Sequence, residues 1–222
     1  MGRLWILSGT GTEIGKTHVG AALLGALAVR GVRALGYKPI ESGVTNDATS
    51  DAARLRAAST LQVQLPYYGL RTPLGPHEAA RREGVRLDLA ALVTACGVAR
   101  RAADVTIVEL PGGLFSPLVA GTSNAAFAAQ IGHDALVLVA PDRLGVLHDV
   151  FACDAAARAN GLTPSALILS EPATPDAATG THADYLRQHT ALRVAAVGRA
   201  PSDELARDPQ LGAIVDALIA MP

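Results

Sequence analysis

A glycine-rich segment near the start of the chain has the residue types that bind phosphate. Residues 8–17 read SGTGTEIGKT and lie between a short apolar run and an amphipathic segment. Backbone N–H groups at the start of a helix point toward an anion, and the helix dipole favours negative charge there. In such a loop Lys16 is expected to bind the outer phosphates of a nucleotide and the Thr17 hydroxyl to bind Mg²⁺. The segment therefore predicts a P-loop, with Thr10 where the strict Walker pattern has glycine.

Three further charged residues stand at the ends of predicted elements. Lys38 follows one apolar run, Glu109 ends another, and Asp51 precedes a helix-like segment. A carboxylate at the end of a buried strand is costly to bury without a partner, which favours a metal or phosphate site. Carboxylate and hydroxyl oxygens suit Mg²⁺, so Thr17, Asp51 and Glu109 are candidate ligands. Two alternatives are an exposed lysine at position 38 and a helix N-cap role for Asp51, with the helix beginning at Ala52.

Short apolar runs rich in β-branched residues alternate with helix-length segments. The predicted strands are 4–7, 32–36, 105–110, 135–140, 166–169 and 194–197. The predicted helices are 16–30, 87–103, 146–160 and 179–190. Strands buried on both faces that alternate with helices indicate a doubly wound, mostly parallel α/β sheet. We expect one domain over residues 1–222, with a long irregular loop over 60–84 at the ligand-binding end of the sheet.

Composition argues against several classes of protein. Of the 222 residues, 50% are hydrophobic and 18% are charged, which predicts a globular chain. A net charge of −1 and only 4% aromatic residues argue against nucleic-acid binding. No apolar run approaches the roughly 20 residues that cross a bilayer, and residues 1–8 lack a signal-peptide cleavage pattern. The two cysteines form no metal-ligand cluster, so we expect a cytoplasmic protein with no membrane partner.

The motifs together resemble the dethiobiotin synthetase family, the ATP-dependent ligases of biotin synthesis. Residues 9–17 read GTGTEIGKT, where that family typically has GTDTE[VI]GKT, and residues 36–43 read GYKPIESG, similar to GYKP[VI]xSG. Residues 108–118 read VELPGGLFSPL, similar to VEGAGGxxxPL, and residues 50–52 and 76–77 match shorter motifs. The resemblance runs in order along nearly the whole chain. It implies a P-loop NTPase-like fold with a deviant Walker motif, related to that of ParA and MinD.

The resemblance also implies a reaction. One amine of 7,8-diaminopelargonic acid takes up CO₂ as a carbamate, ATP phosphorylates the carbamate, and the second amine closes the ureido ring of dethiobiotin. ADP and phosphate are released. An anionic carbamate must attack an anionic γ-phosphate, so catalysis depends mostly on positioning and charge neutralisation. The expected ligands are the diamine, CO₂ or bicarbonate, ATP and Mg²⁺, and the expected partner is a second copy in a homodimer.

Roles for individual residues follow from the same resemblance. The catalytic residues would be Lys16, Lys38, Thr12 and Ser42, with Lys38 bridging the carbamate and the γ-phosphate. The nucleotide would contact Glu13, Ile14, Gly15, Lys16, Thr17, His18, Asp51, Glu109, Gly112, Ser170, Glu171 and Pro201. The diamine would contact Thr12, Lys38, Ser42, Gly113 and Tyr185. Magnesium would be bound by Thr17, Asp51 and Glu109. Tyr185 lies in a segment, 183–186, that resembles one reaching a neighbouring active site in the family's dimer.

The sequence departs from the family's pattern at four sites. Gly11 replaces the aspartate of the loop, and residues 110–111 are Leu-Pro instead of Gly-Ala. Residues 142–143 are Asp-Arg where a Val-Lys pair is common, and residues 170–171 are Ser-Glu where the family has an adenine-reading Asn-Asp. Serine offers one hydroxyl, whereas asparagine offers both a donor and an acceptor to a purine edge. We therefore expect weak discrimination between ATP and other nucleoside triphosphates.

Two alternative functions stay open at this point. A ParA/MinD-type ATPase switch shares the deviant P-loop fold, but it usually carries an extra lysine at the position of Gly11. A divergent relative that binds nucleotide and acts on another substrate is compatible with the changes at 110–111 and at Ser170. The single histidines His77 and His133 have no paired carboxylate in sequence, so structural roles are expected for them.

Overall fold

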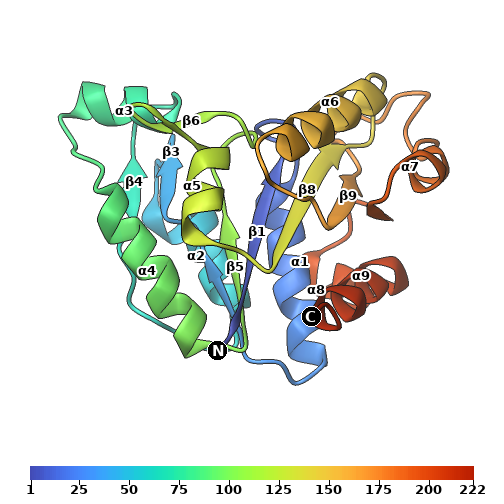
Figure 1. Cartoon of the computed structure of the whole chain (residues 1–222), viewed down its shortest axis with the longest axis horizontal. Helices are drawn as coiled ribbons and strands as arrows, with labels where there is room; N and C mark the ends of the chain where they lie inside the picture. Colours follow the sequence, from blue (N-terminus) through green and yellow to red (C-terminus); the bar gives the residue numbers. More distant parts are fainter.

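A six-stranded parallel sheet forms the centre of the computed structural model, which describes all 222 residues (Figure 1). Its strands, in order across the sheet, are β10 (Arg193–Val197), β9 (Ala166–Ser170), β8 (Ala135–Pro141), β1 (Arg3–Gly9), β5 (Val105–Glu109) and β2 (Ala34–Tyr37). The chain first builds β1, β2 and β5 and then crosses to the other side of β1 for the remaining three strands. Ligands of open α/β sheets bind at such a switch point, beyond the carboxyl ends of the strands.

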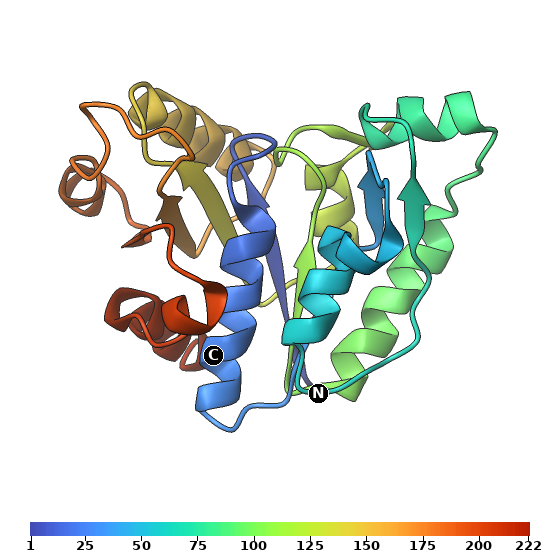
Figure 2. The ribbon, with the colours of Figure 1, turned by 180° about the vertical axis from the view of Figure 1, so that it is seen from behind.

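Helices cover both faces of this sheet. One face carries α1 (Lys16–Val29), α2 (Asp51–Ala58), α8 (Ser202–Leu205) and α9 (Pro209–Ile219), which are nearest the viewer in Figure 2. The other face carries α3 (Pro76–Glu83), α4 (Leu89–Ala102), α5 (Asn124–Ile131), α6 (Val146–Ala159) and α7 (Ala183–His189). Along β1, Trp5 and Leu7 pack with α1, whereas Leu4 and Ile6 belong to the opposite cluster. This alternation confirms the predicted doubly wound, doubly covered parallel sheet.

Short elements extend the fold beyond the main sheet. Strand β3 (Ile40–Ser42) pairs in parallel with β4 (Tyr68–Leu70), and β6 (Pro117–Val119) pairs antiparallel with β7 (Thr122–Ser123). A 3₁₀ turn, η1 (Asp47–Thr49), leads into α2. No helix combines the length and the apolar character that crossing a bilayer would require.

The predicted strands and the helices predicted at 16–30, 87–103 and 146–160 are confirmed to within two residues at each end. The irregular loop predicted over 60–84 is wrong in part, because β4 and α3 form inside it. Helix α3 begins at Pro76, whose fixed φ suits the first helical position, and ends at Gly84 in a left-handed conformation with φ 66°. Only Pro76, Ala79 and Ala80 of its eight residues are buried, so it carries no bulky apolar stripe that would mark it in the sequence. Helices α5, α8 and α9 were also not predicted.

The helix predicted from residue 179 starts four residues later, at Ala183. The side chain of Asp142 explains the delay. Its Oδ2 accepts a hydrogen bond from the Gly180 N–H at 2.9 Å, and its Oδ1 lies 2.6 Å from Nδ1 of His182. These buried contacts hold the residues before Ala183 in a turn against the loop after β8. Asp142 is one of the positions that depart from the family's pattern, and its role here is to anchor that turn.

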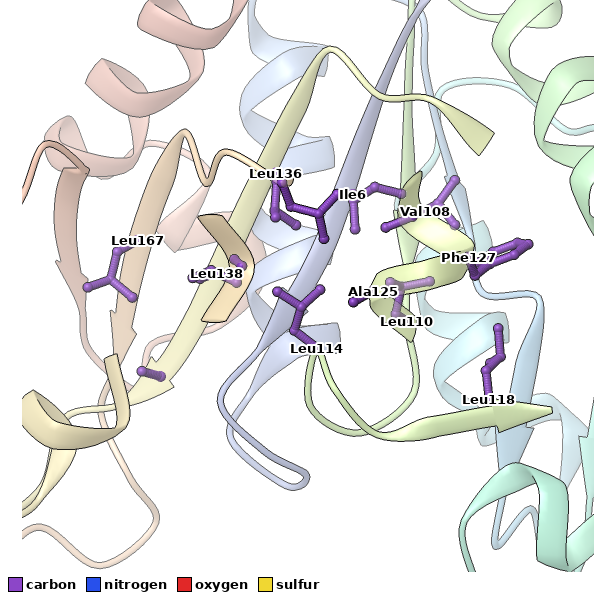
Figure 3. Close-up of a cluster of buried hydrophobic side chains, with 14 of the residues drawn as sticks. Ile6, Val108, Leu110, Leu114, Leu118, Ala125, Phe127, Leu136, Leu138 and Leu167 are labelled. Carbon is purple, nitrogen blue, oxygen red and sulfur yellow. The ribbon is translucent and has the colours of Figure 1, made fainter. Parts of the chain in front are cut away.

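Phe127 on α5 is the largest fully buried side chain in the core between the sheet and helices α4, α5 and α6. It is fully buried, in the cluster that includes Val108 and Leu118 (Figure 3). Figure 3 shows side chains of β1, β5, β8 and α5 gathered between the helices and the sheet. This packing fixes α5 against the end of β5 and therefore affects the loop that follows β5.

We predict that Phe127→Ala lowers the free energy of unfolding by about 3–5 kcal/mol, because truncation leaves a cavity in a close-packed core. Phe127→Leu keeps most of the volume and should cost clearly less. Denaturant unfolding, followed by the fluorescence of Trp5, the single tryptophan of the chain, measures both variants. Equal costs for the two substitutions would contradict the described packing.

Candidate functional site

The turn between β1 and α1 has the backbone of a phosphate-binding loop. Gly15 precedes Lys16, the first residue of α1, with φ 89°. A Cβ atom at Gly15 would lie 2.5 Å from Oγ of Ser170, so both the backbone and the neighbouring strand require glycine there. Glu13 is the single non-glycine residue with positive φ, at 56°. Such strained positions are frequent at ligand-binding turns.

The loop lines a cavity of about 420 Å³ at the carboxyl ends of the central strands. Its walls are residues 12–18 together with Lys38, Glu41, Ser42, Asp51, Arg54, Glu109, Pro111, Gly112 and Arg199. The structure thus brings together the two predicted lysines, the three predicted magnesium ligands and the two predicted hydroxyl residues, Thr12 and Ser42. They come from the P-loop, the segment after β2, the start of α2 and the end of β5.

Lys38 is buried between two carboxylates in the wall of this cavity. Its Nζ donates to Oδ2 of Asp51 at 2.6 Å and to Oε1 of Glu109 at 2.7 Å. Thr17 Oγ1 donates to the same Glu109 oxygen at 2.8 Å. Burial alone would lower the pKa of Lys38, but the charges of Glu109 and Asp51 outweigh burial and raise it above its ordinary value. The side chain therefore stays an ammonium group, and the exposed-lysine alternative for position 38 is wrong.

The other charged groups of the cavity respond to the same burial and pairing. Burial raises the pKa of Glu109, although Lys38 opposes the shift. For Asp51, burial acts to raise the pKa, but the charge and hydrogen bond of Lys38 prevail and the pKa is lowered. Burial lowers the pKa of Lys16 to about 8, with Glu109 acting against this and the charge of Lys38 adding to it. Lys16 and Lys38 line the same cavity, and Lys16 Nζ donates to the Gly11 carbonyl at 2.7 Å.

The oxygen atoms around Thr17 fit a hard divalent cation. Oε2 of Glu109 is buried and has no hydrogen-bond partner, so one carboxylate oxygen is free to bind a ligand. No three His, Cys, Asp or Glu side chains come together to form a metal cage. The protein can offer Glu109, Asp51 and the Thr17 hydroxyl, which leaves positions for phosphate oxygens and water, as Mg²⁺ prefers. These three residues therefore stay our proposed magnesium ligands.

Glu41, which the sequence motifs did not identify, holds the start of α2. Its carboxylate accepts hydrogen bonds from the backbone N–H groups of Asp51 at 2.9 Å and Ala52 at 3.0 Å. The N-cap of α2 is Ser50, so the alternative in which Asp51 caps this helix is wrong. Together Glu41 and Ser50 satisfy three free N–H groups of the first turn and fix the position from which the Asp51 side chain extends.

Asn124 holds the loop after β5 through hydrogen bonds to its backbone. Its fully buried Nδ2 donates to the carbonyl oxygens of Pro111 and Gly113. Gly112 lies between them with φ 68°, and a Cβ atom at Gly113 would approach the Gly9 carbonyl oxygen to 3.3 Å. The Leu-Pro pair that departs from the family's pattern is therefore fixed by an amide from α5. A single asparagine in an alanine-rich segment carries no recognisable pattern, so sequence reasoning missed it.

A second cavity of about 290 Å³ adjoins the first. The two share Glu13, Ile14, Gly15, His18, Arg54 and Arg199 as lining residues. The second cavity also contains Ser170 and Glu171, the predicted base-binding pair, and Oε2 of Glu171 accepts from the backbone N–H of Arg199 at 3.1 Å. Pro201, a predicted nucleotide contact, lines neither cavity and is the residue that precedes α8. The neighbouring Ala200 contacts His18, whose Nε2 lies 2.8 Å from the Ala200 carbonyl oxygen.

Two predicted diamine-binding residues lie outside both cavities. Tyr185 on α7 is 46% exposed, with its ring stacked on His189 at 4.0 Å and edge-on to Phe151 at 6.5 Å. Gly113 lines a separate hollow of about 400 Å³ between the P-loop, the loop after β5 and α6. Within a single chain, Tyr185 therefore does not reach the phosphate-binding cavity.

His133 has the expected structural role, since its Nδ1 lies 3.3 Å from the Ala128 carbonyl oxygen.

Known proteins resemble this chain in sequence. A family model described as an AAA domain matches residues 3–210. The ATP-dependent dethiobiotin synthetase BioD of Aromatoleum aromaticum is 42% identical over 72% of this chain and 74% of that protein. The enzyme of the same name from Rhodopirellula baltica is 34% identical over 92% of this chain and 87% of that protein.

Among solved structures, the similarity is one of fold. The cell division ATPase MinD of Pyrococcus furiosus superposes with a TM-score of 0.58 at 17% identity, covering 98% of this chain and all of that one. A ParA family ATPase from Chlorobium tepidum gives a TM-score of 0.59 at 12% identity, covering 99% of this chain and all of that one. These values confirm the predicted P-loop NTPase-like architecture.

We predict that Glu41→Ala raises the Mg²⁺ concentration needed for half-maximal nucleotide binding several-fold, because the turn that carries Asp51 loosens. A magnesium titration with a fluorescent nucleotide measures this. The matched control is Asp88→Ala, which removes the side-chain cap of α4, bonded to the Ala91 N–H at 3.0 Å. Loss of a cap costs about 0.5–2 kcal/mol of stability in either helix. The same magnesium dependence in both variants would show that Glu41 acts on stability alone.

Proposed function

The chain belongs to the family of ATP-dependent dethiobiotin synthetases, and we propose that it joins CO₂ to the two amines of 7,8-diaminopelargonic acid. The enzyme is an ATP-dependent ligase, and closure of the ureido ring gives dethiobiotin with release of ADP and phosphate. One observation carries this proposal: Lys16 and Lys38, far apart in the chain, line one cavity together with Thr17, Asp51 and Glu109.

Fixed positive charge is what this reaction needs from the protein. An anionic carbamate must approach an anionic phosphate, and preorganised cations lower the energy of the crowded transition state. Lys38 is suited to this role because its two carboxylate partners keep it protonated, so it acts as a fixed cation and not as a proton carrier. Lys16 would bind the outer phosphates, and the hydroxyls of Thr12 and Ser42 would hydrogen-bond the carbamate. Bound Mg²⁺ would neutralise further phosphate charge.

The alternative of a ParA/MinD-type switch has less support. Its relatives share the fold at 12–17% identity in the two structures named above, and a shared fold does not imply a shared function. The dethiobiotin synthetases match at 34–42% identity in the two enzymes named above. Lys38 lines the same cavity as Lys16, and it would face a second anionic substrate there once bound Mg²⁺ neutralises Asp51 and Glu109.

We further propose that the enzyme acts as a homodimer through the surface around α6 and α7. Phe115, Leu144, Phe151 and Tyr185 are exposed apolar or aromatic side chains on or next to these helices. A second copy covering this surface would bury them and could bring Tyr185 to the diamine of a neighbouring site. Sedimentation equilibrium of the purified chain tests the association.

Two broader proposals concern the chain as a whole. We propose that residues 1–222 act as a single ligase domain, because one sheet takes strands from Arg3 to Val197 and α9 packs back onto α1. A cytoplasmic location is also our proposal. It is supported by the two cysteines, Cys96 and Cys153, which are both free thiols.

The decisive experiment measures cyclic urea formed from the diamine, bicarbonate and ATP. A ligase releases phosphate only when all three are present, whereas a switch ATPase hydrolyses ATP without diamine or bicarbonate. The same assay with GTP and CTP tests base selectivity, and we expect turnover within about tenfold of that with ATP, a difference of about 1.4 kcal/mol. Phosphate release at the same rate with and without the diamine would refute the ligase proposal. A preference for ATP much greater than tenfold would refute the prediction of weak base selectivity.

We predict that Lys38→Met reduces cyclic urea formation at least about 100-fold, the scale on which loss of one preorganised charge lowers kcat. Nucleotide binding should stay measurable, because the P-loop is intact. Lys16→Ala is the contrasting variant, in which nucleotide binding itself should be lost. Steady-state rates combined with calorimetric binding of ADP separate the two effects. Unchanged turnover in Lys38→Met would remove Lys38 from the mechanism.

A further inference from the structure

Two arginines line both cavities and have no assigned role. Arg54 lies on α2, three residues after Asp51, and Arg199 lies in the segment that follows β10. These two elements flank the start of α1 on its two sides (Figure 2). Both side chains are exposed, and neither guanidinium group lies within salt-bridge distance of a carboxylate, although the charge of Arg54 helps to lower the pKa of Asp51. Their positive charges are therefore available to a ligand.

The charge balance of the phosphate-binding cavity depends on these two residues. Four cationic side chains face four carboxylates there: Lys16, Lys38, Arg54 and Arg199 against Glu13, Glu41, Asp51 and Glu109. The charge of Lys38 is already balanced by Asp51 and Glu109. Without the two arginines, two lysines would face four carboxylates, and only bound Mg²⁺ and the N–H groups of the P-loop would offset that excess of negative charge. Arg54 and Arg199 thus supply much of the attraction that an anionic ligand meets.

The location of the arginines indicates which part of a nucleotide they meet. The inner cavity contains Lys16 and the proposed magnesium ligands, and the outer one contains Ser170 and Glu171. If a nucleotide places its outer phosphates in the inner cavity and its base in the outer cavity, the phosphates closest to its ribose lie at the junction that the two cavities share. We infer that Arg54 and Arg199 bind these phosphates of the nucleotide at the junction between the two cavities. The inference rests on the ATP-dependent function proposed above.

The chemistry of the guanidinium group supports this assignment. Its planar set of N–H donors matches phosphate oxygens and binds them in pairs, with stronger hydrogen bonds than neutral donors make. Phosphate contacts carry no information about the base. If Arg54 and Arg199 provide much of the nucleotide affinity, that affinity does not depend on the base. This agrees with weak base selectivity in the outer cavity, where Ser170 offers a single hydroxyl, packed against Gly15.

Calorimetric binding of ADP with Mg²⁺ to the full chain, in the absence of diamine and bicarbonate, tests the inference. Arg54→Ala and Arg199→Ala should each weaken ADP binding about tenfold, which corresponds to about 1.4 kcal/mol. Arg54→Lys should retain most of the affinity, and GDP should show the same losses as ADP. Added salt should weaken binding to the wild-type chain more than to the double variant, because exposed charges are screened.

The matched controls are Arg56→Ala, on the same helix but outside both cavities, and Arg207→Ala, beyond α8. Neither should change ADP affinity, and thermal melting verifies that all variants are folded. ADP affinity within twofold of wild type in Arg54→Ala and Arg199→Ala would overturn the inference, as would equal losses in the controls.

The outcomes also separate this inference from the proposed function. If the wild-type chain binds ADP through both arginines but forms no cyclic urea, the ligase proposal fails and the inference stands. If it forms cyclic urea while both alanine variants bind ADP normally, only the inference fails. A wild-type chain that binds no ADP would overturn both.

Discussion

A single ammonium group buried between two carboxylates connects the fold of this protein to its chemistry. Lys38, Asp51 and Glu109 come from the segment after β2, the start of α2 and the end of β5, and Thr17 joins them from α1. Each charge would be unfavourable alone in this position, and together they compensate one another. Four elements must therefore assemble correctly before the charges are tolerated, and once assembled they hold a fixed cation beside the P-loop.

Residues outside this ion-paired cluster determine how accurately it is placed. Glu41 fixes the first turn of α2 from outside the helix, and Asn124 fixes the loop after β5 from α5. Gly15 allows Ser170 to pack against the P-loop. These contacts support the catalytic groups by removing conformational freedom, which is how a site stays preorganised for a transition state. Positions 110–111 and 142, which depart from the family's pattern, each belong to a turn that hydrogen bonds hold in place.

The same architecture occurs in ATPases such as MinD and a ParA family protein, so the fold by itself does not determine which reaction takes place. In this chain, the cavity beside the P-loop contains both ion-paired and unpaired cationic side chains. Lys38 is paired with two carboxylates, whereas no salt bridge engages Lys16, Arg54 or Arg199, which line the same cavity.

The sequence by itself determined the features whose residues are contiguous. The P-loop is visible because its glycines, Lys16 and Thr17 follow one another, and the six strands are visible because burial on both faces makes each one a continuous apolar run. Only the tertiary structure decided which charges pair, that Ser50 and Glu41 and not Asp51 cap α2, and that Arg54 and Arg199 face the cavity. Such contacts join residues distant in the chain, and local periodicity carries no information about which distant partner a polar side chain will meet.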